Sequence, residues 1–382
     1  MSLTGTTVWL MVGGPVLAVD APAALMESVR SVQVTQSEAG SGFQIAFDVD
    51  PAPGASGSTG PGVLHSLLLK PYNRVVIGAA LNGTSTVLMD GVITHMELSP
   101  AQGGQPSTFT VTGSDLTAVM DLWELSREFP AASPAMTVAE ILLPYILFGI
   151  VPLVIPSGLS VPPLPVERVP IQNCTDLAFI RQLACENGYD FHLRPGPVPL
   201  TNVAYWGPRV RIGMLKPALS VNLGPGTNVD ALTFSYDATA PTITYGSVLE
   251  ETTNLEVPVV GVPLFNLPPF AAAPAIVVNV PYVRASLFQQ PGRTWFESMR
   301  MASAQVTRSV ENVLVAKGEL DSFRYGTALT ARSLVGVRGA GYEYDGIYYV
   351  HSVTHTLQAG SWRQSFELVR EGLGTTTPLV MP

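Results

Sequence analysis

The sequence predicts a mainly β fold with α+β insertions, arranged as two similar antiparallel β-barrels and a small helical α/β domain. Polar and apolar residues alternate in several short segments, as they do in half-buried strands. Glycine and proline are frequent, at 35 and 33 of 382 residues, and they divide the chain into short elements. A similar hairpin pattern also occurs in both halves. We expect an N-terminal barrel at 1–125, the α/β domain at 126–220, and a second barrel at 221–382 that is interrupted by an insertion at about 250–310.

The first unit is predicted to consist mainly of strands. Apolar residues alternate with polar ones over residues 43–49, and the alternation returns over 75–81. Asn82-Gly83 then provides a tight hairpin turn. Residues 51–62 have the composition of a flexible surface loop. A short helix that begins at Ser114-Asp115 and runs to about residue 125 is expected to close the unit.

The middle unit is predicted to mix helices and strands. Thr137 and Glu140 form a capping box, so a helix is expected to start there. A second helix begins near Thr175-Asp176, carries an apolar face and ends at Gly188. Strand alternation resumes over residues 189–193. The unit therefore reads as a small α/β domain.

The last unit returns to strands at 219–223 and 232–236. Residues 258–283 carry no charge and several prolines, so we expect an extended excursion rather than a central strand or a helix. A helix follows at about 294–310, and strands continue from 313 almost to the end. The excursion and this helix make up the predicted insertion.

The repeated hairpin supports a duplication. Asp90-Gly91 is followed by an alternating segment, a polar reversal and a returning strand at 109–113. Asp345-Gly346 is followed by the same features, with the returning strand at 366–368. We interpret each Asp-Gly pair as a turn that starts a hairpin. One barrel in each half of the chain explains the pattern.

The composition excludes several classes of protein. Hydrophobic residues make up 47% of the chain, which excludes a disordered protein, and a net charge of −9 argues against nucleic-acid binding. Charged residues are only 13%, about half the usual share. A chain so poor in charge is expected to cover much of its surface with partners, so an oligomer or an assembly component is predicted.

Targeting segments are not expected. The apolar stretch at 8–19 has no preceding Lys or Arg, so we predict no signal peptide. Residues 141–166 carry no charge, but six prolines would break a spanning helix, so we predict no membrane span. Fourteen of the 33 prolines fall at 144–170 and 258–291, two segments that we expect to lie at subunit contacts.

Nucleophilic and phosphate-binding motifs are missing from the sequence. Cys174 and Cys185 are predicted to be two buried thiols without a disulfide or a metal. The lysines are Lys70, Lys216 and Lys317, and none follows a glycine-rich turn, so there is no phosphate-binding loop. Ser56 lies in a sequence that misses the nucleophile elbow at its last position, and the loop interpretation is preferred.

The histidines do not predict a metal site. His351 and His355 are four residues apart on a predicted strand, where that spacing spans roughly 13 Å. They are expected to be surface or interface residues rather than shared ligands. His65, His95 and His192 are isolated in the sequence.

The carboxylates and tryptophans do not predict an active site either. Glu250-Glu251 are adjacent and point apart on a strand, whereas Asp121 and Glu124 are expected on one solvated helix face. The tryptophans, including Trp123, Trp206, Trp295 and Trp362, are scattered and are expected to pack in cores or interfaces. We therefore predict no enzyme, no catalytic residues, no cofactor and no metal.

The order of motifs resembles one known family. The helix motif runs from Ile171 through Thr175-Asp176 to Gly188-Tyr189, reading IQNCTDLAFIRQLACENGY. The closing motif runs from Gly346 to His355, reading GIYYVHSVTH, and is followed by FELVR at 366–370. Together they resemble the phage late control D family, the baseplate hubs of contractile tails, and the hub part of VgrG spikes. The resemblance covers nearly the whole chain.

The resemblance implies a structural function. Family members form trimers whose two barrels per subunit give a ring of six, matching a hexameric inner tube on one side and a threefold spike on the other. This chain ends at Pro382 without a spike region, so the spike is expected to be a separate polypeptide. The implied partners are two further copies, the inner tube ring, the spike and baseplate wedge proteins, with no nucleic-acid binding of its own. The particle would be made in the bacterial cytoplasm and assembled into a phage tail or a released injection machine.

Two alternatives come from other functional classes. One alternative is a hub-associated cell-wall-degrading enzyme with an unrecognised carboxylate pair. The other is a peripheral adhesin. An adhesin is expected at the periphery of a particle, whereas a hub must lie on its axis. The choice between a phage tail and an extracellular injection system also stays open.

Overall fold

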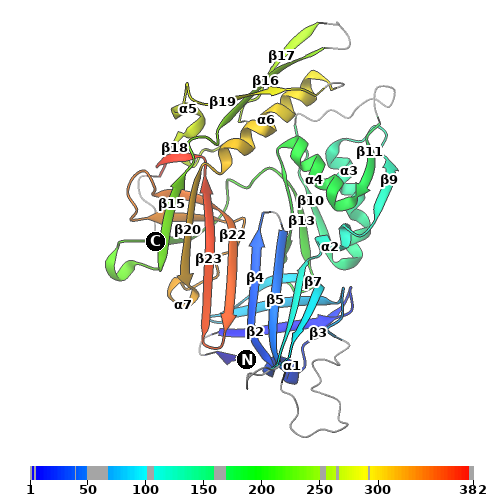
Figure 1. The fold of residues 1–382 in the computed structure, drawn as a ribbon, viewed down its shortest axis with the longest axis vertical. Coiled ribbons are helices and arrows are strands. Elements are labelled where there is room, and N and C mark those ends of the chain that lie inside the picture. The colour runs from blue at the N-terminus through cyan, green and yellow to red at the C-terminus, as the bar shows by residue number, and fades with distance from the viewer. Residues whose placement is uncertain are drawn as a thin grey trace.

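The computed structural model describes residues 2–3, 6–38, 40–49, 68–100, 107–158, 169–249, 255–263, 266–290 and 293–377. The fold is mainly β with α+β insertions. In these residues, one large sheet of 14 strands runs through the molecule, and the longer helices lie in two blocks outside it (Figure 1). We call these the middle block, residues 116–207, and the insertion, residues 242–311.

The N-terminal part of the sheet contains six strands that we call the first strand set. Their hydrogen-bonded order is β4-β5-β8-β7-β6-β2, and all neighbours are antiparallel. Buried apolar side chains on one face of this set form a core that includes Ile45, Phe47 and Ile77. The strands are β2 (Thr6–Gly13), β4 (Val29–Ser37), β5 (Gly40–Val49), β6 (Arg74–Leu81), β7 (Thr84–Ser99) and β8 (Ser107–Asp115).

The C-terminal part contains six strands in the same order, which we call the second strand set. Here the order is β15-β20-β23-β22-β21-β14, so each strand has a counterpart in the first set at the same place in the chain. The last pair differs, because β14 and β21 are parallel whereas β2 and β6 are antiparallel. The strands are β14 (Leu215–Ser220), β15 (Ala231–Tyr236), β20 (Leu314–Asp321), β21 (Leu334–Arg338), β22 (Gly346–Gln358) and β23 (Ser361–Arg370).

The two strand sets are joined edge to edge. Residues 31–37 of β4 pair antiparallel with residues 352–358 of β22. In Figure 1 this joint lies in the middle of the sheet, with β7 at one margin and β15 at the other. At the far end of the first set, β2 is also paired with β1 (Ser2–Leu3) and β3 (Ala18–Asp20). Two short helices connect strands of the sheet: α1 (Ala23–Glu27) lies between β3 and β4 in the chain, and α7 (Ser322–Tyr325) lies between β20 and β21.

The middle block packs helices against small sheets. Its core includes Ile141, Ile180 and Trp206. Helix α4 behaves as predicted: Thr175 caps its N-terminus by accepting from the Ala178 N–H, and Gly188 ends it in the left-handed region. The elements are α2 (Thr117–Met120), β9 (Glu124–Glu128), α3 (Pro134–Leu142), η1 (Leu143–Phe148), β10 (Ile150–Val154), β11 (Ile171–Thr175), α4 (Asp176–Asn187), β12 (Asp190–Pro195) and β13 (Asn202–Gly207).

The insertion lies between β15 and β20 of the second set. Helix α6 packs on β16 and β17 around a small core that includes Val259 and Met301. Thr294 and Glu297 form a capping box at the start of α6, which fixes its N-terminus where the sequence predicted it. The elements are β16 (Thr242–Leu249), β17 (Glu256–Val260), β18 (Ala271–Pro274), α5 (Ala275–Val278), β19 (Arg284–Phe288) and α6 (Trp295–Glu311); η2 (Gly224–Gly226) precedes them and β24 (Gly372–Thr375) pairs with β18.

Several predicted elements are confirmed. Strands cover 43–49, 75–81 and 232–236, and a strand at 314–321 follows the predicted helix at 294–310. Asn82 and Gly83 have φ angles of 51° and 81°, as the tight turn between β6 and β7 requires. The predicted loop at 51–62 lies outside the described residues.

Other predictions are wrong. The helix expected to reach residue 125 has a single turn, because β9 begins at Glu124 and pairs with β11. The cap of helix α3 is Ser133, four residues before the predicted cap Thr137, which is buried inside the helix. The excursion at 258–283 includes the short helix α5 and strand β18 as well as part of β17. Asp90-Gly91 lies inside β7 rather than at a turn.

In the described part of the chain, none of the helices combines the length and the apolar character that crossing a bilayer requires.

Candidate functional site

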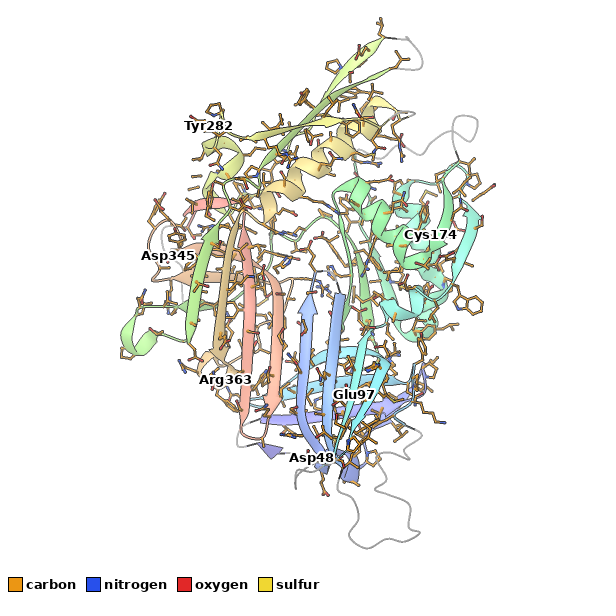
Figure 2. All side chains as sticks on the ribbon, viewed as in Figure 1. Asp48, Glu97, Cys174, Tyr282, Asp345 and Arg363 are labelled. Atoms are coloured by element: carbon orange, nitrogen blue, oxygen red, sulfur yellow. The ribbon has the colours of Figure 1, made fainter. Side chains whose placement is uncertain are left out.

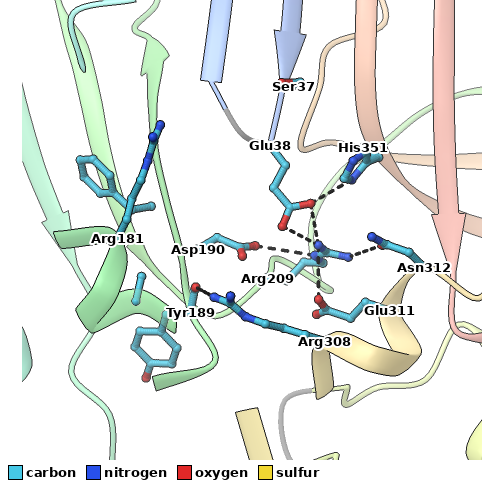
Figure 3. A pocket seen from close by; sticks show the side chains of 12 residues that line it. Ser37, Glu38, Arg181, Tyr189, Asp190, Arg209, Arg308, Glu311, Asn312 and His351 are labelled. Carbon is cyan, nitrogen blue, oxygen red and sulfur yellow. Dashed lines mark hydrogen bonds and ion pairs between the residues drawn. The ribbon is translucent and has the colours of Figure 1, made fainter. Parts of the chain in front are cut away.

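A buried arginine joins four parts of the molecule. Arg209 follows β13, and it meets Glu38 at the end of β4, Asp190 at the start of β12 and Glu311 at the end of α6 (Figure 3). His351 of β22 lies beside Glu38. We call these five residues the Arg209 junction. It brings together both strand sets, the middle block and the insertion.

The distances describe a dense ionic network. Arg209 Nη2 lies 2.7 Å from both carboxylate oxygens of Glu38 and 3.3 Å from Glu311 Oε2. Its Nε lies 3.6 Å from Asp190 Oδ2. His351 Nδ1 lies 2.9 Å from Glu38 Oε2. The planar guanidinium suits this arrangement, because its five N–H groups can serve several carboxylates at once.

Neighbouring groups hold the guanidinium in place. Its carbon lies 4.8 Å from the ring centre of Tyr349, which is a cation–π contact. Its Nη1 donates to Asn312 Oδ1 at 3.3 Å. Glu311 is the last residue of α6, where the helix dipole disfavours a negative charge. Arg209 therefore offsets a charge that the helix end alone would destabilise.

Burial of three carboxylates around one arginine shifts their ionisation. The pKa of Asp190 is raised to about 7, because burial disfavours its charged form and Glu38 and Glu311 add negative charge, while Arg209 opposes the rise. Burial also raises the pKa of Glu311. Burial alone would raise the pKa of Glu38, but the hydrogen bond from His351 and the charge of Arg209 hold it well below its usual range. Among these carboxyl groups, burial thus brings the pKa of Asp190 closest to neutral, whereas Glu38 is held in its charged form.

A cavity of about 510 Å³ lies beside the junction. Besides the junction it is lined by Arg181 and Tyr189 of the middle block and by Arg308 of α6 (Figure 3). Arg308 donates to the Tyr189 carbonyl and to Cys185 Sγ, each at 3.0 Å, which ties α6 to α4. A carboxyl group with a pKa near 7 is suited to proton transfer. Here, however, Asp190 faces a guanidinium that holds three acids, so the arrangement is suited to fastening the four parts together.

A second buried ion pair ties the first strand set to the middle block. Arg74 of β6 donates to both oxygens of Asp90 on β7 at 2.7 Å, and both side chains are at most 1% exposed. Asn202 of β13 donates to the same carboxylate at 2.8 Å. Arg74 also donates to the carbonyls of Val16 and Leu200. A bidentate pair with its remaining hydrogen bonds satisfied is the form in which a buried charge is tolerated.

A third buried arginine connects the insertion to the end of the second strand set. Arg211 lies 3.2 Å from Glu371 and donates to Asn266 at 3.0 Å. Its guanidinium also lies 4.7 Å from the ring centre of Phe270. Three contacts between major parts of the chain thus contain a buried arginine with a carboxylate: those of Arg74, Arg209 and Arg211.

The sequence predicted His351 and His355 to be surface or interface residues, and the structure places the two differently. His351 belongs to the Arg209 junction, but His355 is fully buried, with its Nδ1 accepting from Trp362 Nε1 at 3.3 Å. Burial lowers the pKa of His355 to about 3. The prediction of surface exposure is wrong for His355, because this residue lies inside the β4–β22 joint, opposite Val34, with its ring beside the buried Trp362. His192 is also buried and stacks on Tyr205, whereas His95 is exposed.

The predicted burial of both cysteines is also wrong. Cys174 on β11 is half-buried, Cys185 on α4 is exposed, and both are free thiols. Cys185 lies on the side of α4 that faces solvent and Arg308, which the helical spacing did not reveal. In the residues that the structure describes, no group of three His, Cys, Asp or Glu side chains is placed to hold a metal ion.

The remaining candidates are scattered. Asp121 follows α2 and accepts from Thr175 Oγ1 at 2.6 Å, whereas Glu124 starts β9, so the expected shared helix face is wrong. Trp206 and Trp362 are buried in cores and Trp123 is exposed. Lys216 contacts the Ala328 carbonyl. Ser56, His65 and Glu250-Glu251 lie outside the described residues.

The sequence analysis did not identify the Arg209 junction. Its members come from positions 38, 190, 209, 311 and 351, and they follow no local motif. The one available signal was the scarcity of charge: in a chain with 13% charged residues, charges within apolar strand sequences are candidates for buried pairs.

Comparison with known proteins shows the fold. The 43 kDa tail protein of prophage MuSo2 from Shewanella oneidensis has a TM-score of 0.63 at 12% identity, covering 96% of this chain and 98% of its own. A tail protein from Neisseria meningitidis MC58 has a TM-score of 0.63 at 11% identity, covering 97% and 98%. A type VI secretion system component from E. coli, similar to bacteriophage T4 tail proteins gp27 and gp5, has a TM-score of 0.53 at 12% identity, covering 93% and 77%.

Comparison of the sequence alone finds no related family model or curated protein. No protein-family model matches the chain, and no curated protein sequence is significantly similar to it. The chain therefore has the fold of phage tail and type VI secretion proteins, with a sequence that has diverged to about one identical residue in eight.

Proposed function

We propose that this chain is a structural baseplate hub of a contractile injection machine, of the late control D type. Three copies would form a ring that joins a hexameric inner tube to a separate central spike. The observation that carries the proposal is the repeated strand order, β4-β5-β8-β7-β6-β2 and β15-β20-β23-β22-β21-β14, in one chain. The fold shared with solved tail proteins over nearly the whole chain supports it.

The repeat supplies a physical reason for a trimer. Two similar units per copy and three copies give six similar surfaces around one axis, so a single type of contact can serve a six-subunit ring. In this proposal the first strand set is a barrel-like unit within residues 1–125, and the second is a barrel-like unit within residues 221–382. Residues 126–220 form the α/β domain, except that β14 belongs to the second barrel-like unit. The insertion then lies outside the repeated part.

The distribution of apolar surface supports partners at the blocks outside the sheet. Exposed large apolar side chains in the described residues lie mainly on the middle block and the insertion. Leu147 and Leu153 are examples on the middle block, and Val277 and Tyr282 on the insertion, where Tyr282 points away from the body (Figure 2). Surfaces of this kind are typical of protein contacts. We assign them to the tube, the spike or baseplate wedge proteins.

The function we propose is not enzymatic. The Arg209 junction holds its carboxylates around a buried guanidinium, which suits a rigid joint in a particle that transmits force. The proposal includes no nucleic-acid binding and places the chain in a tail-like particle assembled in the bacterial cytoplasm. The proposal includes both a phage tail and a released injection machine, because the same ring would serve in either particle.

The mass of the purified chain in solution tests the proposal. Size-exclusion chromatography with light scattering is expected to give three times 40.5 kDa, which is 121.5 kDa. Negative-stain images of that species would show a ring with six similar lobes. A chain that stays at 40.5 kDa with inner tube and spike proteins present would contradict the proposal. Clearing of peptidoglycan in a zymogram, lost in Asp190→Asn, would favour the enzyme alternative.

A further inference from the structure

In the row of strands from β7 to β15, two strand edges have no partner among the described residues. β15 pairs with β20 on one side only. β7 is longer than β6: its first part, up to Val92, pairs with β6, whereas His95–Ser99 pair only with β8. These edges lie at opposite margins of the row of strands in Figure 1, so they cannot pair with each other in one copy.

The counterparts of these two edges are already joined inside the chain. In the repeat, β7 corresponds to β22 and β15 corresponds to β4. The second half of β22 pairs with β4 over seven residues. The in-chain joint therefore shows how an edge of the β7 type and an edge of the β15 type fit together.

A shared β-bulge fixes which residues correspond. The ladder between β7 and β8 is interrupted after Ile93, and the ladder between β22 and β23 is interrupted after Val350. Ile93 thus corresponds to Val350, a difference of 350 − 93 = 257 positions. By this difference Leu98 of β7 corresponds to His355 of β22.

The ladders extend the correspondence to the other edge. From the bulge in the first set, Gly113 is opposite Phe43, and Phe43 is opposite Val34 of β4. From the bulge in the second set, Leu368 is opposite Ala316, and Ala316 is opposite Phe234 of β15. Val34 therefore corresponds to Phe234, a difference of 234 − 34 = 200 positions.

We propose that β15 of one copy pairs antiparallel with residues 95–99 of β7 in a neighbouring copy, repeating the β4–β22 joint. This inference rests on the proposed trimer and names the surface that builds it. Val34 is opposite His355 inside the chain, so Phe234 is placed opposite Leu98 of the neighbour. The same register places Tyr236 opposite Met96, Ser235 opposite Glu97, and Asp237 opposite His95 of the neighbouring copy.

The side chains at the two edges match this register. Leu98 is 47% exposed although its neighbour across the ladder, Phe109, is buried, whereas its counterpart His355, which is opposite Val34 of β4, is 0% exposed. Phe234 would cover Leu98 on the apolar face. On the other face, Asp237 would lie opposite His95 of the neighbour and Ser235 opposite Glu97. In the internal joint, the positions that correspond to Ser235 and Glu97 are Thr35 and Thr354, whose hydroxyl groups hydrogen-bond at 3.1 Å.

The backbones are also suited to pairing. Asp237 N–H donates to Val313 O at 2.9 Å, so the odd residues of β15 bond to β20 and the even residues turn their N–H and C=O groups to the open edge. Neither β15 nor residues 95–99 contain a proline or a lysine, the residues that commonly protect an exposed edge. The far edge of β2, by contrast, is covered by β1 and β3.

The proposed joint closes a ring of three copies. Each copy contributes eight strands, in the order β7-β8-β5-β4-β22-β23-β20-β15. Joining β15 to the next β7 gives 3 × 8 = 24 strands and leaves neither of the two edges unpaired. Internal and intermolecular joints of one type then alternate around the axis, as pseudo-sixfold symmetry requires.

Cysteine cross-linking tests the register. In a background with Cys174→Ser and Cys185→Ser, Ser235→Cys and Glu97→Cys are combined in one chain. These positions form a non-hydrogen-bonded pair in the proposed ladder, where Cα atoms approach to about 4.5 Å. Mild oxidation is expected to convert most of the chain to dimers and trimers on non-reducing gels. The pair Ser235→Cys and Leu98→Cys is the control, because Leu98 points to the other face, and it is expected to give less than about a tenth of that product.

A charge at the open edge provides the second test. Leu98→Glu is expected to convert the trimer to monomer while leaving the circular dichroism spectrum unchanged, because the side chain is half-exposed in one copy. Leu122→Glu is the matched control, since Leu122 is also 47% exposed but lies in the middle block, and it is expected to remain a trimer. A trimer that does not cross-link and tolerates Leu98→Glu would overturn this joint while leaving the hub proposal intact. A parent chain that stays monomeric with inner tube and spike proteins present would contradict the hub proposal itself.

Discussion

Strands β7 and β22 occupy the same place in the two strand sets, and they differ in what covers them. Both carry a bulge at the corresponding position and both pair with the returning strand of a hairpin. Beyond the bulge, β22 is covered by β4 and its His355 is buried, whereas β7 ends with Leu98 exposed. The difference shows that equivalent strands of a repeat have different neighbours in one chain, and in the proposed ring the open part of β7 is the edge that a further copy would pair with.

Placing the same charge at both positions should give the largest difference. His355→Glu introduces a carboxylate where β4 closes the core, so the free energy of unfolding is expected to fall by about 3–5 kcal/mol. Leu98→Glu is expected to change the stability of the monomer by less than about 0.5 kcal/mol, because the position is solvated there. Urea unfolding of both variants, at a concentration where the chain is monomeric, measures this. Equal losses would mean that the two strands are not in comparable environments.

The strand sets also differ in how they hold neighbouring parts. Arg74 is opposite Val92 in the first set, and Leu334 is opposite Tyr349, the counterpart of Val92, in the second. Leu334 is therefore the counterpart of Arg74, so the second set has an apolar residue where the first has the arginine of an ion pair. Arg74→Leu leaves Asp90 buried without its cation and is expected to cost about 3 kcal/mol in urea unfolding.

Replacing both members of the pair sharpens that comparison. The double variant Arg74→Leu/Asp90→Ile gives the first set the residues that the second set has at these two places. The counterpart of Asp90, 257 positions further along the chain, is Ile347. It is expected to recover at least half of the loss, because no unpaired charge remains. A double variant no more stable than Arg74→Leu would show that the carbonyl and Asn202 contacts dominate.

The Arg209 junction should give a smaller, pH-dependent effect. The pKa of Asp190 is about 7 in the folded chain and about 4 in the unfolded one, so its contribution to stability falls as pH rises from about 4 to about 7. Asp190→Asn does not ionise, so its stability relative to the parent chain is expected to rise over that interval by more than about 1 kcal/mol.

Urea midpoints measured from about pH 2 to about pH 8 provide the readout. Glu38→Gln is the opposite control, because the pKa of Glu38 is lowered by His351 and Arg209 and its contribution is lost as pH falls below about 4. A constant difference between Asp190→Asn and the parent chain at every pH would exclude a proton held at Asp190.

Local pattern predicted the elements better than their assembly. The strands at 43–49 and 75–81 and helix α4 were predicted because periodicity and caps are written in adjacent residues. The repeated hairpin was recognised, but the Asp-Gly pairs were aligned at a difference of 255 positions, whereas the shared bulge gives 257. Asp90 is a buried ion-pair partner rather than a turn residue, and local sequence does not distinguish these two roles.

The joints could not be predicted from the sequence. The β4–β22 pairing connects residues more than 300 positions apart, and a register between such strands is decided by the packing of both faces. The Arg209 junction draws its members from five separate segments, so no spacing identifies it. His355 and Cys185 were misplaced for the same reason, because burial depended on which strand or helix covered each residue.

A density map of the purified chain by electron cryomicroscopy tests the central claim most directly. The account predicts a threefold particle in which six similar sheets surround one axis, with β15 of each copy continuing into residues 95–99 of the next. A map in which the copies meet through the middle block or the insertion alone, leaving both edges exposed, would contradict it.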